Sequence, residues 1–352
     1  MKKIVLTGGG SAGHIMPHVA LLEPLKKHFN ELHYIGSGGI EKSIMTAYPE
    51  ISFHEIDAPK LRRSLTLKNL AVPFRLLMSV CRAKKLLRDI APNVIFSKGG
   101  FVSLPVISAA AALDIPSVLH ESDATFGLAN RLSVKNAAKV LTSFAEAAAL
   151  RPPYIHTGTP IRPSLYGGTR AAGLKESGLS GVKPVILIIG GSLGARALNE
   201  TVRAALPEIT ARYDLIHICG RGNTVTTSQR GYFQLEFALE PSDIYAAADI
   251  VISRAGSNAI AEFAALKKPM LLIPLPAAAS RGDQLVNAEI FRRNGWARVL
   301  PQEKLTPQAL PQAIESLYRE RGTLVSALTT APSFDGTDRV LAEILSSFPN
   351  TT

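Results

Sequence analysis

The same combination of a short apolar strand and a glycine-rich loop occurs twice, at the start of the chain and near its middle. Residues 3–7 (KIVLT) lead into 8–13 (GGGSAG), and residues 183–189 (KPVILII) lead into 190–195 (GGSLGA). A strand, a glycine turn and a helix make the first βα unit of a doubly wound α/β domain, in which the helix N-terminus can hold a phosphate. The repeat therefore predicts two similar parallel-sheet domains facing a central ligand crevice.

The length of 352 residues agrees with two domains. Prolines interrupt any regular element near the middle, so we place the link between about 155 and 165. The Gly- and Ser-rich residues 164–183 are predicted to be loop. The predicted boundaries are 1–160 for an N-terminal domain, 161–335 for a C-terminal domain, and 336–352 for a terminal helix that packs back on the N-terminal domain.

The first glycine loop matches G-x-G-x-x-G through Gly8, Gly10 and Gly13, which alone suggests a nicotinamide dinucleotide site. The next predicted strand ends in Gly36, where such a site needs an acidic residue for the ribose. The sequence therefore disfavours a nicotinamide-dependent oxidoreductase and indicates that the loop holds a different ligand.

Residues 253–288 contain the strongest signals for a nucleotide sugar. Ala255–Asn258 predicts a turn and a helix N-terminus, which suit a diphosphate, and Glu262 follows one helical turn later on the same face. A carboxylate there can accept hydrogen bonds from a ribose diol. The polar loop 280–284 follows the next strand at its carboxyl end, where α/β sheets bind ligands. Each feature alone is equally an ordinary helix face or a solvated loop, but together they favour a binding site.

Further polar residues follow predicted strands elsewhere. The segment SKGG (97–100) and the segment HESD (120–123) each end a strand of the first half, and Ser192 lies in the second glycine loop, where it can meet a phosphate. For His120 a structural role is the favoured interpretation.

The formal net charge of +11 favours an anionic partner such as acidic lipid, a phosphorylated substrate or nucleic acid. No recognisable nucleic-acid-binding module is present, so we expect no nucleic acid partner. The two cysteines, Cys81 and Cys219, predict neither a disulfide framework nor a zinc site and agree with a reducing compartment. No apolar run reaches the length of about 20 residues that a spanning helix needs.

Six motifs in order along the chain resemble those of the MurG family, whose members transfer N-acetylglucosamine (GlcNAc) from UDP-GlcNAc to the lipid-linked muramyl-pentapeptide precursor of peptidoglycan. The motifs are TGGGSAGH (7–14), SKGGFVSLP (97–105), HESDATFGLAN (120–130), GGSLGAR (190–196), SRAGSNAIAE (253–262) and SRGDQLVNA (280–288). The closest similarity is to the form found in Gram-positive bacteria.

The resemblance implies an α/β GT-B fold with two Rossmann-like domains, of which the first faces the acceptor and the membrane and the second mainly holds the UDP-sugar. It also implies inverting transfer to the 4-hydroxyl of undecaprenyl-diphospho-muramoyl-pentapeptide (lipid I) to give lipid II. It implies no cofactor. The UDP-GlcNAc contacts it implies are Ser11, Ala12, Gly13, Arg162, Ser192, Glu262 and Gln284. Further candidate contacts are Asp123, Asn130, Phe237, Ser257, Asn258, Asp283 and Asn287. His14 is the candidate general base, because an imidazole titrates near neutrality, although it could instead only orient the glycine loop.

Three positions depart from the common family pattern, which has Asn at Asp123, Asn at Thr159 and Gln at Leu193. Two other functions share some of these features. One is a different lipid glycosyltransferase that uses UDP-sugars, such as a diacylglycerol glycosyltransferase, and the other is a nucleotide-sugar-binding protein without catalysis.

No Asp-x-Asp sequence occurs, so we expect no metal site and assign the departing diphosphate to helix N-termini and to Arg162. Residues 68–89 are amphipathic. Their apolar residues, which we expect to pack on the domain's own sheet, are Leu70, Phe74, Leu77, Met78 and Cys81. Their basic residues, which predict peripheral binding to the anionic cytoplasmic face of the cell membrane, are Lys68, Arg75, Arg82, Lys84, Lys85 and Arg88, with Lys60, Arg62 and Arg63 upstream.

Overall fold

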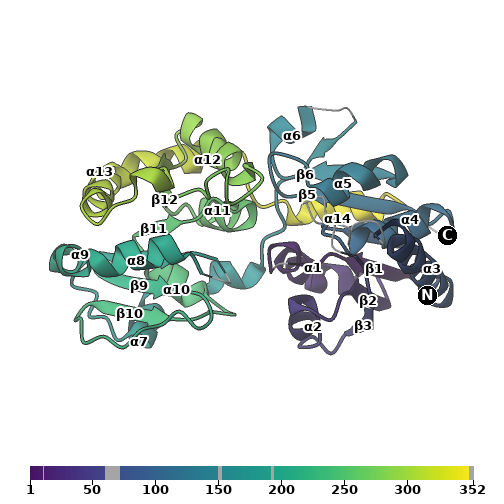
Figure 1. Cartoon of the computed structure of the whole chain (residues 1–352), viewed down its shortest axis with the longest axis horizontal. Coiled ribbons are helices and arrows are strands. Elements are labelled where there is room, and N and C mark those ends of the chain that lie inside the picture. Colours follow the sequence, from purple (N-terminus) through teal and green to yellow (C-terminus); the bar gives the residue numbers. More distant parts are fainter. Residues whose placement is uncertain (11, 60–71, 150–152, 192–193, 349–352) are drawn as a thin grey trace. The chain divides into compact units, whose positions relative to one another are not determined.

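The computed structural model describes residues 1–10, 12–59, 72–149, 153–191 and 194–348. They form two compact units, the first from 1–162 with 336–352 and the second from 163–335 (Figure 1). The predicted site residues Ser11 and Ser192 and the variant position Leu193 lie outside the described residues. So do Lys60, Arg62, Arg63, Lys68 and Leu70 of the predicted basic segment.

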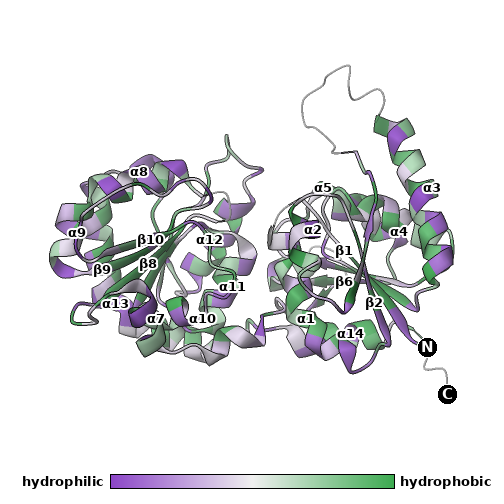
Figure 2. Ribbon diagram, turned by 90° about the horizontal axis from the view of Figure 1, so that it is seen from below, coloured by the Kyte–Doolittle hydropathy of each residue, from purple (hydrophilic) through white to green (hydrophobic). Residues whose placement is uncertain are grey.

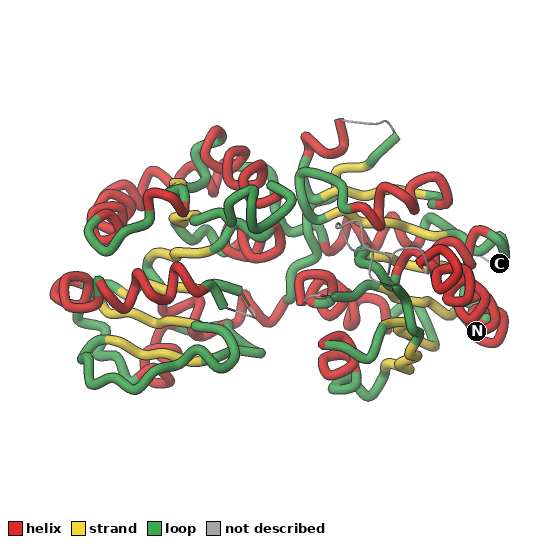
Figure 3. Tube along the Cα trace, viewed as in Figure 1, coloured by secondary structure: helices red, strands yellow, loops and turns green. Residues whose placement is uncertain are grey.

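Within the described residues of the first unit, seven parallel strands form one sheet in the order β3-β2-β1-β4-β5-β6-β7 (Figure 3). They are β1 Lys3–Thr7, β2 Glu31–Gly36, β3 Ile51–Glu55, β4 Val94–Ser97, β5 Ser117–Glu121, β6 Lys139–Thr142 and β7 Ile155–His156. The central strand β1 buries Ile4 and Leu6 in one apolar core and Val5 in another. Two buried faces explain the continuous apolar runs of these strands, as is usual for a parallel sheet.

Helices cover both faces of this sheet. They are α1 Met16–Lys26, α2 Ile40–Met45, α3 Val72–Ile90, α4 Ser103–Ala111, α5 Leu128–Ser133, α6 Ala145–Ala149 and α14 Thr337–Leu345, with short 3₁₀ turns η1 Ala12–His14 and η3 Val134–Asn136. The terminal helix α14 places Val340 and Ile344 in the same core as Leu21 of α1 (Figure 1). Lys139 and Glu343, 2.6 Å apart, add an ion pair between β6 and α14.

The described part of the second unit contains a sheet of six parallel strands in the order β10-β9-β8-β11-β12-β13. The strands are β8 Val185–Ile189, β9 Asp214–Ile218, β10 Tyr232–Leu235, β11 Ile250–Ser253, β12 Met270–Leu272 and β13 Arg298–Val299. The helices are α7 Arg170–Ser177, α8 Arg196–Ala204, α9 Leu206–Arg212, α10 Ser242–Ala247, α11 Ser257–Ala265, α12 Asp283–Arg293 and α13 Ala309–Thr330, with 3₁₀ turns η4 Pro163–Gly167 and η5 Gln302–Lys304. The prediction of two parallel-sheet α/β domains is confirmed.

The prediction that residues 164–183 form a loop is wrong, because they contain η4 and α7. The hydroxyl of Thr169 accepts a hydrogen bond from the N–H of Ala172 and so caps α7, while Gly178 ends the helix in the left-handed conformation. Gly173 is needed for packing rather than for a turn. A Cβ there would lie 2.1 Å from the carbonyl oxygen of Asp243, so this glycine allows α7 to approach α10 closely.

The expectation that the apolar residues of 68–89 pack on the sheet is also wrong for the described residues. Phe74, Leu77 and Met78 of α3 are 67%, 60% and 44% exposed. The face of α3 that packs inward instead carries Ala83 and Leu87, on the opposite side of the helix. Hydrophobic and hydrophilic residues therefore share the outer surface of α3 (Figure 2).

Candidate functional site

Two glycine loops of the first unit touch where β1 and β4 end. Gly10, Gly99 and Gly100 all have positive φ angles, which favour glycine. A Cβ on Gly100 would lie 2.2 Å from the carbonyl oxygen of Gly9, so no side chain fits between the loops. The 3₁₀ turn η1, with Ala12 and Gly13, continues the first loop toward α1.

His14 is half-buried at the end of η1, and its Nδ1 lies 2.9 Å from the carbonyl oxygen of Gly9. Because a carbonyl oxygen only accepts hydrogen bonds, Nδ1 must donate, and the neutral ring then has its lone pair on Nε2. This is the tautomer that a general base needs. The same hydrogen bond also fixes the glycine loop, so both roles predicted for His14 are compatible with the geometry.

The loop after β5 is folded around the buried carboxylate of Glu121. It accepts hydrogen bonds from the N–H of Asp123 at 3.2 Å, the N–H of Gly127 at 2.8 Å and Nδ2 of Asn130 at 3.0 Å. Burial raises the pKa of Glu121, and the negative charge of Asp123 raises it further. Asp123 is half-buried, whereas Asn130 is buried and its amide also contacts the carbonyl oxygen of His120. Asn130 thus supports the loop that presents Asp123.

The second glycine loop, after β8, also contains a glycine with a positive φ angle that packs closely against a neighbouring segment. Gly194 has a φ of +78°, and a Cβ there would lie 2.2 Å from the carbonyl oxygen of Cys219. Helix α8 begins at Arg196 without a hydrogen bond from the side chain of its N-cap residue, Ala195. Its first N–H groups are therefore not capped by that side chain and suit an anion.

The turn between β11 and α11 gives a second helix N-terminus in this unit. Gly256 is the N-cap residue of α11, and a Cβ built on it would meet no described atom within 4 Å. Ser257 is buried, whereas Asn258 and Glu262 are half-buried, one turn apart on α11. The structure thus places three of the residues predicted to contact UDP-GlcNAc on one short helix.

Arg254 lies just before this turn and was not predicted as a site residue. It is 7% exposed, with Nη1 2.9 Å from the carbonyl oxygen of Ile273 and Nη2 2.6 Å from Oε1 of Gln302. Both partners are neutral, and among the described residues Nε has no hydrogen-bond partner. Burial accordingly lowers the pKa of Arg254. Among the described residues, no carboxylate pairs with Arg254, which precedes α11 by three residues in the chain.

The polar loop after β12 is held by residues predicted to contact the donor. Oε1 of Gln284 accepts a hydrogen bond from the N–H of Leu275 at 3.1 Å. Asn287 is fully buried, and its Nδ2 donates to the carbonyl oxygen of Ala255 at 3.2 Å. Asn287 therefore joins α12 to the turn before α11. Asp283 begins α12 and lies 3.4 Å from Nε of Arg281.

Two more predicted contact residues are Phe237 and Arg162. Phe237 follows β10 and is half-buried, and the guanidinium of Arg221 lies 5.7 Å from the centre of its ring. Arg162 is buried, at the end of the first unit's main segment.

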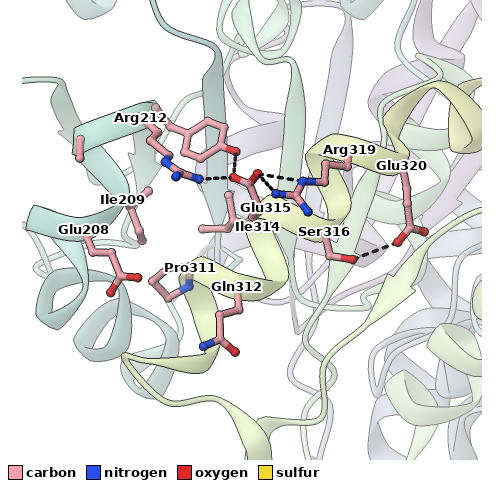
Figure 4. Close-up of a pocket in the computed structure, with 12 residues that line it drawn as sticks. Glu208, Ile209, Arg212, Pro311, Gln312, Ile314, Glu315, Ser316, Arg319 and Glu320 are labelled. Carbon is pink, nitrogen blue, oxygen red and sulfur yellow. Dashed lines mark hydrogen bonds and ion pairs between the residues drawn. The ribbon is translucent and has the colours of Figure 1, made fainter.

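A cavity of about 720 Å³ in the second unit does not involve these residues. It lies between α9 and α13, and Arg212, Tyr213 and Arg319 on its wall all bond to the carboxylate of Glu315 (Figure 4). Arg212 and Tyr213 directly precede β9, so the cavity is at the amino-terminal edge of the sheet. The glycine loop and the turn before α11 follow the carboxyl ends of their strands, at the opposite edge.

Two family models match the chain, one for each unit. The model of the glycosyltransferase family 28 N-terminal domain matches residues 4–142, and that of the glycosyltransferase family 28 C-terminal domain matches residues 185–335.

Named relatives are similar over nearly the whole chain. A protein of Lachnoclostridium phytofermentans is 46% identical over 350 residues, 98% of each chain, and one of Bacillus thuringiensis subsp. konkukian is 48% identical over 334 residues, 93% of this chain and 95% of the relative. The first is named UDP-N-acetylglucosamine–N-acetylmuramyl-(pentapeptide) pyrophosphoryl-undecaprenol N-acetylglucosamine transferase, and the second has the same name followed by the number 2. The crystal structure of Acinetobacter baumannii MurG is 25% identical and superposes with a TM-score of 0.76, covering 98% of this chain and 100% of that one.

Proposed function

Because the chain belongs to glycosyltransferase family 28, we propose that it transfers GlcNAc from UDP-GlcNAc to the 4-hydroxyl of lipid I, giving lipid II for peptidoglycan synthesis. The observation that carries this proposal is the 46% identity over 98% of both chains with a relative named for this reaction. The glycine loops and the N-termini of α8 and α11, whose N-cap residues make no side-chain hydrogen bond, are features that suit the diphosphate of a UDP-sugar.

The reaction forms a bond between the acceptor oxygen and the anomeric carbon of GlcNAc and breaks the bond from that carbon to the diphosphate. His14 takes the proton of the acceptor hydroxyl through Nε2. We assign the stabilisation of the departing UDP anion to the N-termini of α8 and α11 and to Arg162. Glu262 holds the ribose diol. Displacement in one step inverts the α linkage of the donor to a β linkage.

A UDP-release assay with two acceptors separates this function from that of a diacylglycerol glycosyltransferase. Purified protein is incubated with UDP-GlcNAc and either lipid I or diacylglycerol in the same detergent. We expect UDP release that depends on lipid I. Release with diacylglycerol alone supports the other lipid glycosyltransferase, and no release with either acceptor supports a binding protein without catalysis.

Glu262→Ala should weaken UDP binding by about 1.5–3 kcal/mol, roughly 10- to 150-fold in Kd, because hydrogen bonds to a carboxylate are lost. Calorimetry of UDP binding measures this change. Glu289→Ala, which removes an exposed carboxylate of α12, is the matched control and should bind UDP like the wild type. An unchanged Kd in folded Glu262→Ala would remove Glu262 from the donor site.

Activity should persist in excess EDTA, because we assign the stabilisation of the departing diphosphate to helix N-termini and Arg162 rather than to a metal ion. Lipid II formation is compared with and without the chelator. Loss of turnover that added magnesium restores would contradict the assignment.

The same proposal includes peripheral binding of the first unit to an anionic membrane, because lipid I remains in the bilayer. Phe74, Leu77 and Met78 of α3 are exposed beside the exposed bases Arg75, Arg82, Lys85 and Arg88. Apolar and basic side chains on one helix surface are typical of binding to acidic head groups. Leu128 and Leu132 of α5 add exposed apolar area to the same unit. Among the described residues, no helix is both long and apolar enough to cross a membrane.

A further inference from the structure

Lys98 is a buried lysine between β4 and the glycine pair Gly99–Gly100. It is 1% exposed, and its ammonium donates a hydrogen bond to Nδ1 of His120 on β5. On the other side of the ring, Nε2 of His120 donates to the carbonyl oxygen of Gly158 at 2.8 Å. Since that carbonyl only accepts, Nδ1 is left as the acceptor for Lys98. Lys98 thereby links the ends of β4 and β5 to the segment after β7.

The charge of Lys98 is poorly compensated. No carboxylate in the described part of the chain forms an ion pair with it, and Glu121 and Asp123 act on it from a greater distance. Burial lowers the pKa of Lys98 to about 7, although these two carboxylates oppose the shift. Burial and the neighbouring Lys98 hold the pKa of His120 well below its usual range, so His120 is neutral. Burying an amine without an ion-pair partner destabilises the fold, so we expect Lys98 to have a role besides packing.

His120 also begins the segment that carries Asp123 and Asn130, two of the further candidate contacts. Its carbonyl oxygen contacts Nδ2 of Asn130, which in turn bonds to Glu121, and Glu121 holds the N–H of Asp123. A Cβ on Gly99 would lie 2.8 Å from Oδ1 of Asn130, so the residue after Lys98 packs against the same amide. Lys98 is therefore connected to this segment both through His120 and through Gly99.

We propose that Lys98 is a positioning residue for the acceptor: through His120 it sets the place of residues 120–130, whose Asn130 packs against Gly99 of the glycine pair. The inference rests on the proposed function, in which the first unit binds lipid I and the second binds UDP-GlcNAc. Loss of the Lys98 amine should impair use of the acceptor lipid I and leave binding of the donor UDP-GlcNAc intact.

The test is Lys98→Met, which keeps the length of the side chain and removes its charge and its hydrogen bond. We expect kcat/KM for lipid I to fall roughly ten- to a hundred-fold, the scale for a slightly misplaced site, with unchanged KM for UDP-GlcNAc and unchanged Kd for UDP. Lys268→Met is the matched control. Lys268 is a mostly buried lysine of the second unit, before β12, that bonds to the carbonyl oxygen of Ala248.

A second variant removes the acceptor of the hydrogen bond between Lys98 and His120. His120→Phe keeps a ring and removes both nitrogens, and it should give the same acceptor-specific loss. The double variant should be no worse than the poorer single one, because both changes break one link. If Lys98→Met fails to fold, as judged by its melting transition and UDP binding, the acceptor and donor constants of His120→Phe decide the matter.

Several results would overturn the inference. They are unchanged use of lipid I in folded Lys98→Met, an equal loss of UDP affinity, or additive effects in the double variant. A wild-type protein that does not glycosylate lipid I would remove the proposed function and this inference together. An active wild type with an unaffected Lys98→Met would remove the inference alone.

Discussion

Replacing His14 by alanine should lower kcat by about 10²–10⁴-fold, the usual contribution of a general base, while the affinity for UDP stays near that of the wild type. The reason is the geometry of the ring, whose Nδ1 is occupied by the carbonyl oxygen of Gly9 and whose Nε2 then has the lone pair. The measurement is the rate of lipid II formation at saturating donor and acceptor, with calorimetry of UDP binding alongside.

His14→Asn separates catalysis from loop support. Its side-chain amide can still donate to the carbonyl oxygen of Gly9, but it cannot act as a base. We expect it to be as inactive as the alanine variant, whereas a residue that only orients the loop would be rescued by Asn. His28→Ala changes an exposed histidine of the same unit and should keep full activity. A kcat above about a tenth of wild type in His14→Ala would make His14 merely structural.

Replacing Arg75, Arg82, Lys85 and Arg88 together by glutamine should release the protein from anionic vesicles. Each basic residue near such a surface contributes about 1 kcal/mol at low salt, so the four together predict a loss in partitioning of up to about 10³-fold. Sedimentation with phosphatidylglycerol-containing vesicles at low and high salt measures this effect. Binding of the wild type should itself weaken as salt rises.

The matched control removes the same charge from the second unit by changing Arg292, Arg293, Lys304 and Arg321 to glutamine. All four are exposed. It should bind vesicles nearly as well as the wild type, and both variants should keep the wild-type affinity for UDP-GlcNAc. Equal sedimentation of the α3 variant and the wild type at low salt would place the docking surface elsewhere. An equal loss in the control would mean that net charge, rather than α3, drives binding.

The features that the sequence predicted well are local in the chain. The strands β1 and β8 and their glycine loops are contiguous segments in which apolar runs stop at glycine, and Gly10 and Gly194 have the positive φ angles that such loops require. Glu262 was placed by helical spacing from Asn258, which needs only a periodicity of 3.6 residues. Both inferences depend on neighbours a few residues away.

The features that it did not predict depend on contacts between distant segments. Lys98 is hydrogen-bonded to His120 on the neighbouring strand β5, and His120 in turn to Gly158. Arg254 is hydrogen-bonded to Ile273 and Gln302, which are also distant in the chain. Their only sequence signal is a basic residue directly after a buried strand.

Helix α7 was missed because Gly173, read as a loop residue, serves close packing on α10. The exposed residues of α3 were misjudged for a related reason. Helical periodicity identifies an apolar face, but Ser79, Ala83 and Leu87 on another face make the contact with the rest of the unit.

The structure of the product tests the proposed glycosyl transfer most directly. Purified protein is incubated with UDP-GlcNAc and lipid I, and the mass of the lipid product and the anomeric configuration of its new linkage are determined. We expect the gain of one GlcNAc residue, joined by a β linkage to the 4-hydroxyl of the muramoyl sugar. Lipid I that gains no mass, or a product with an α linkage, would contradict it.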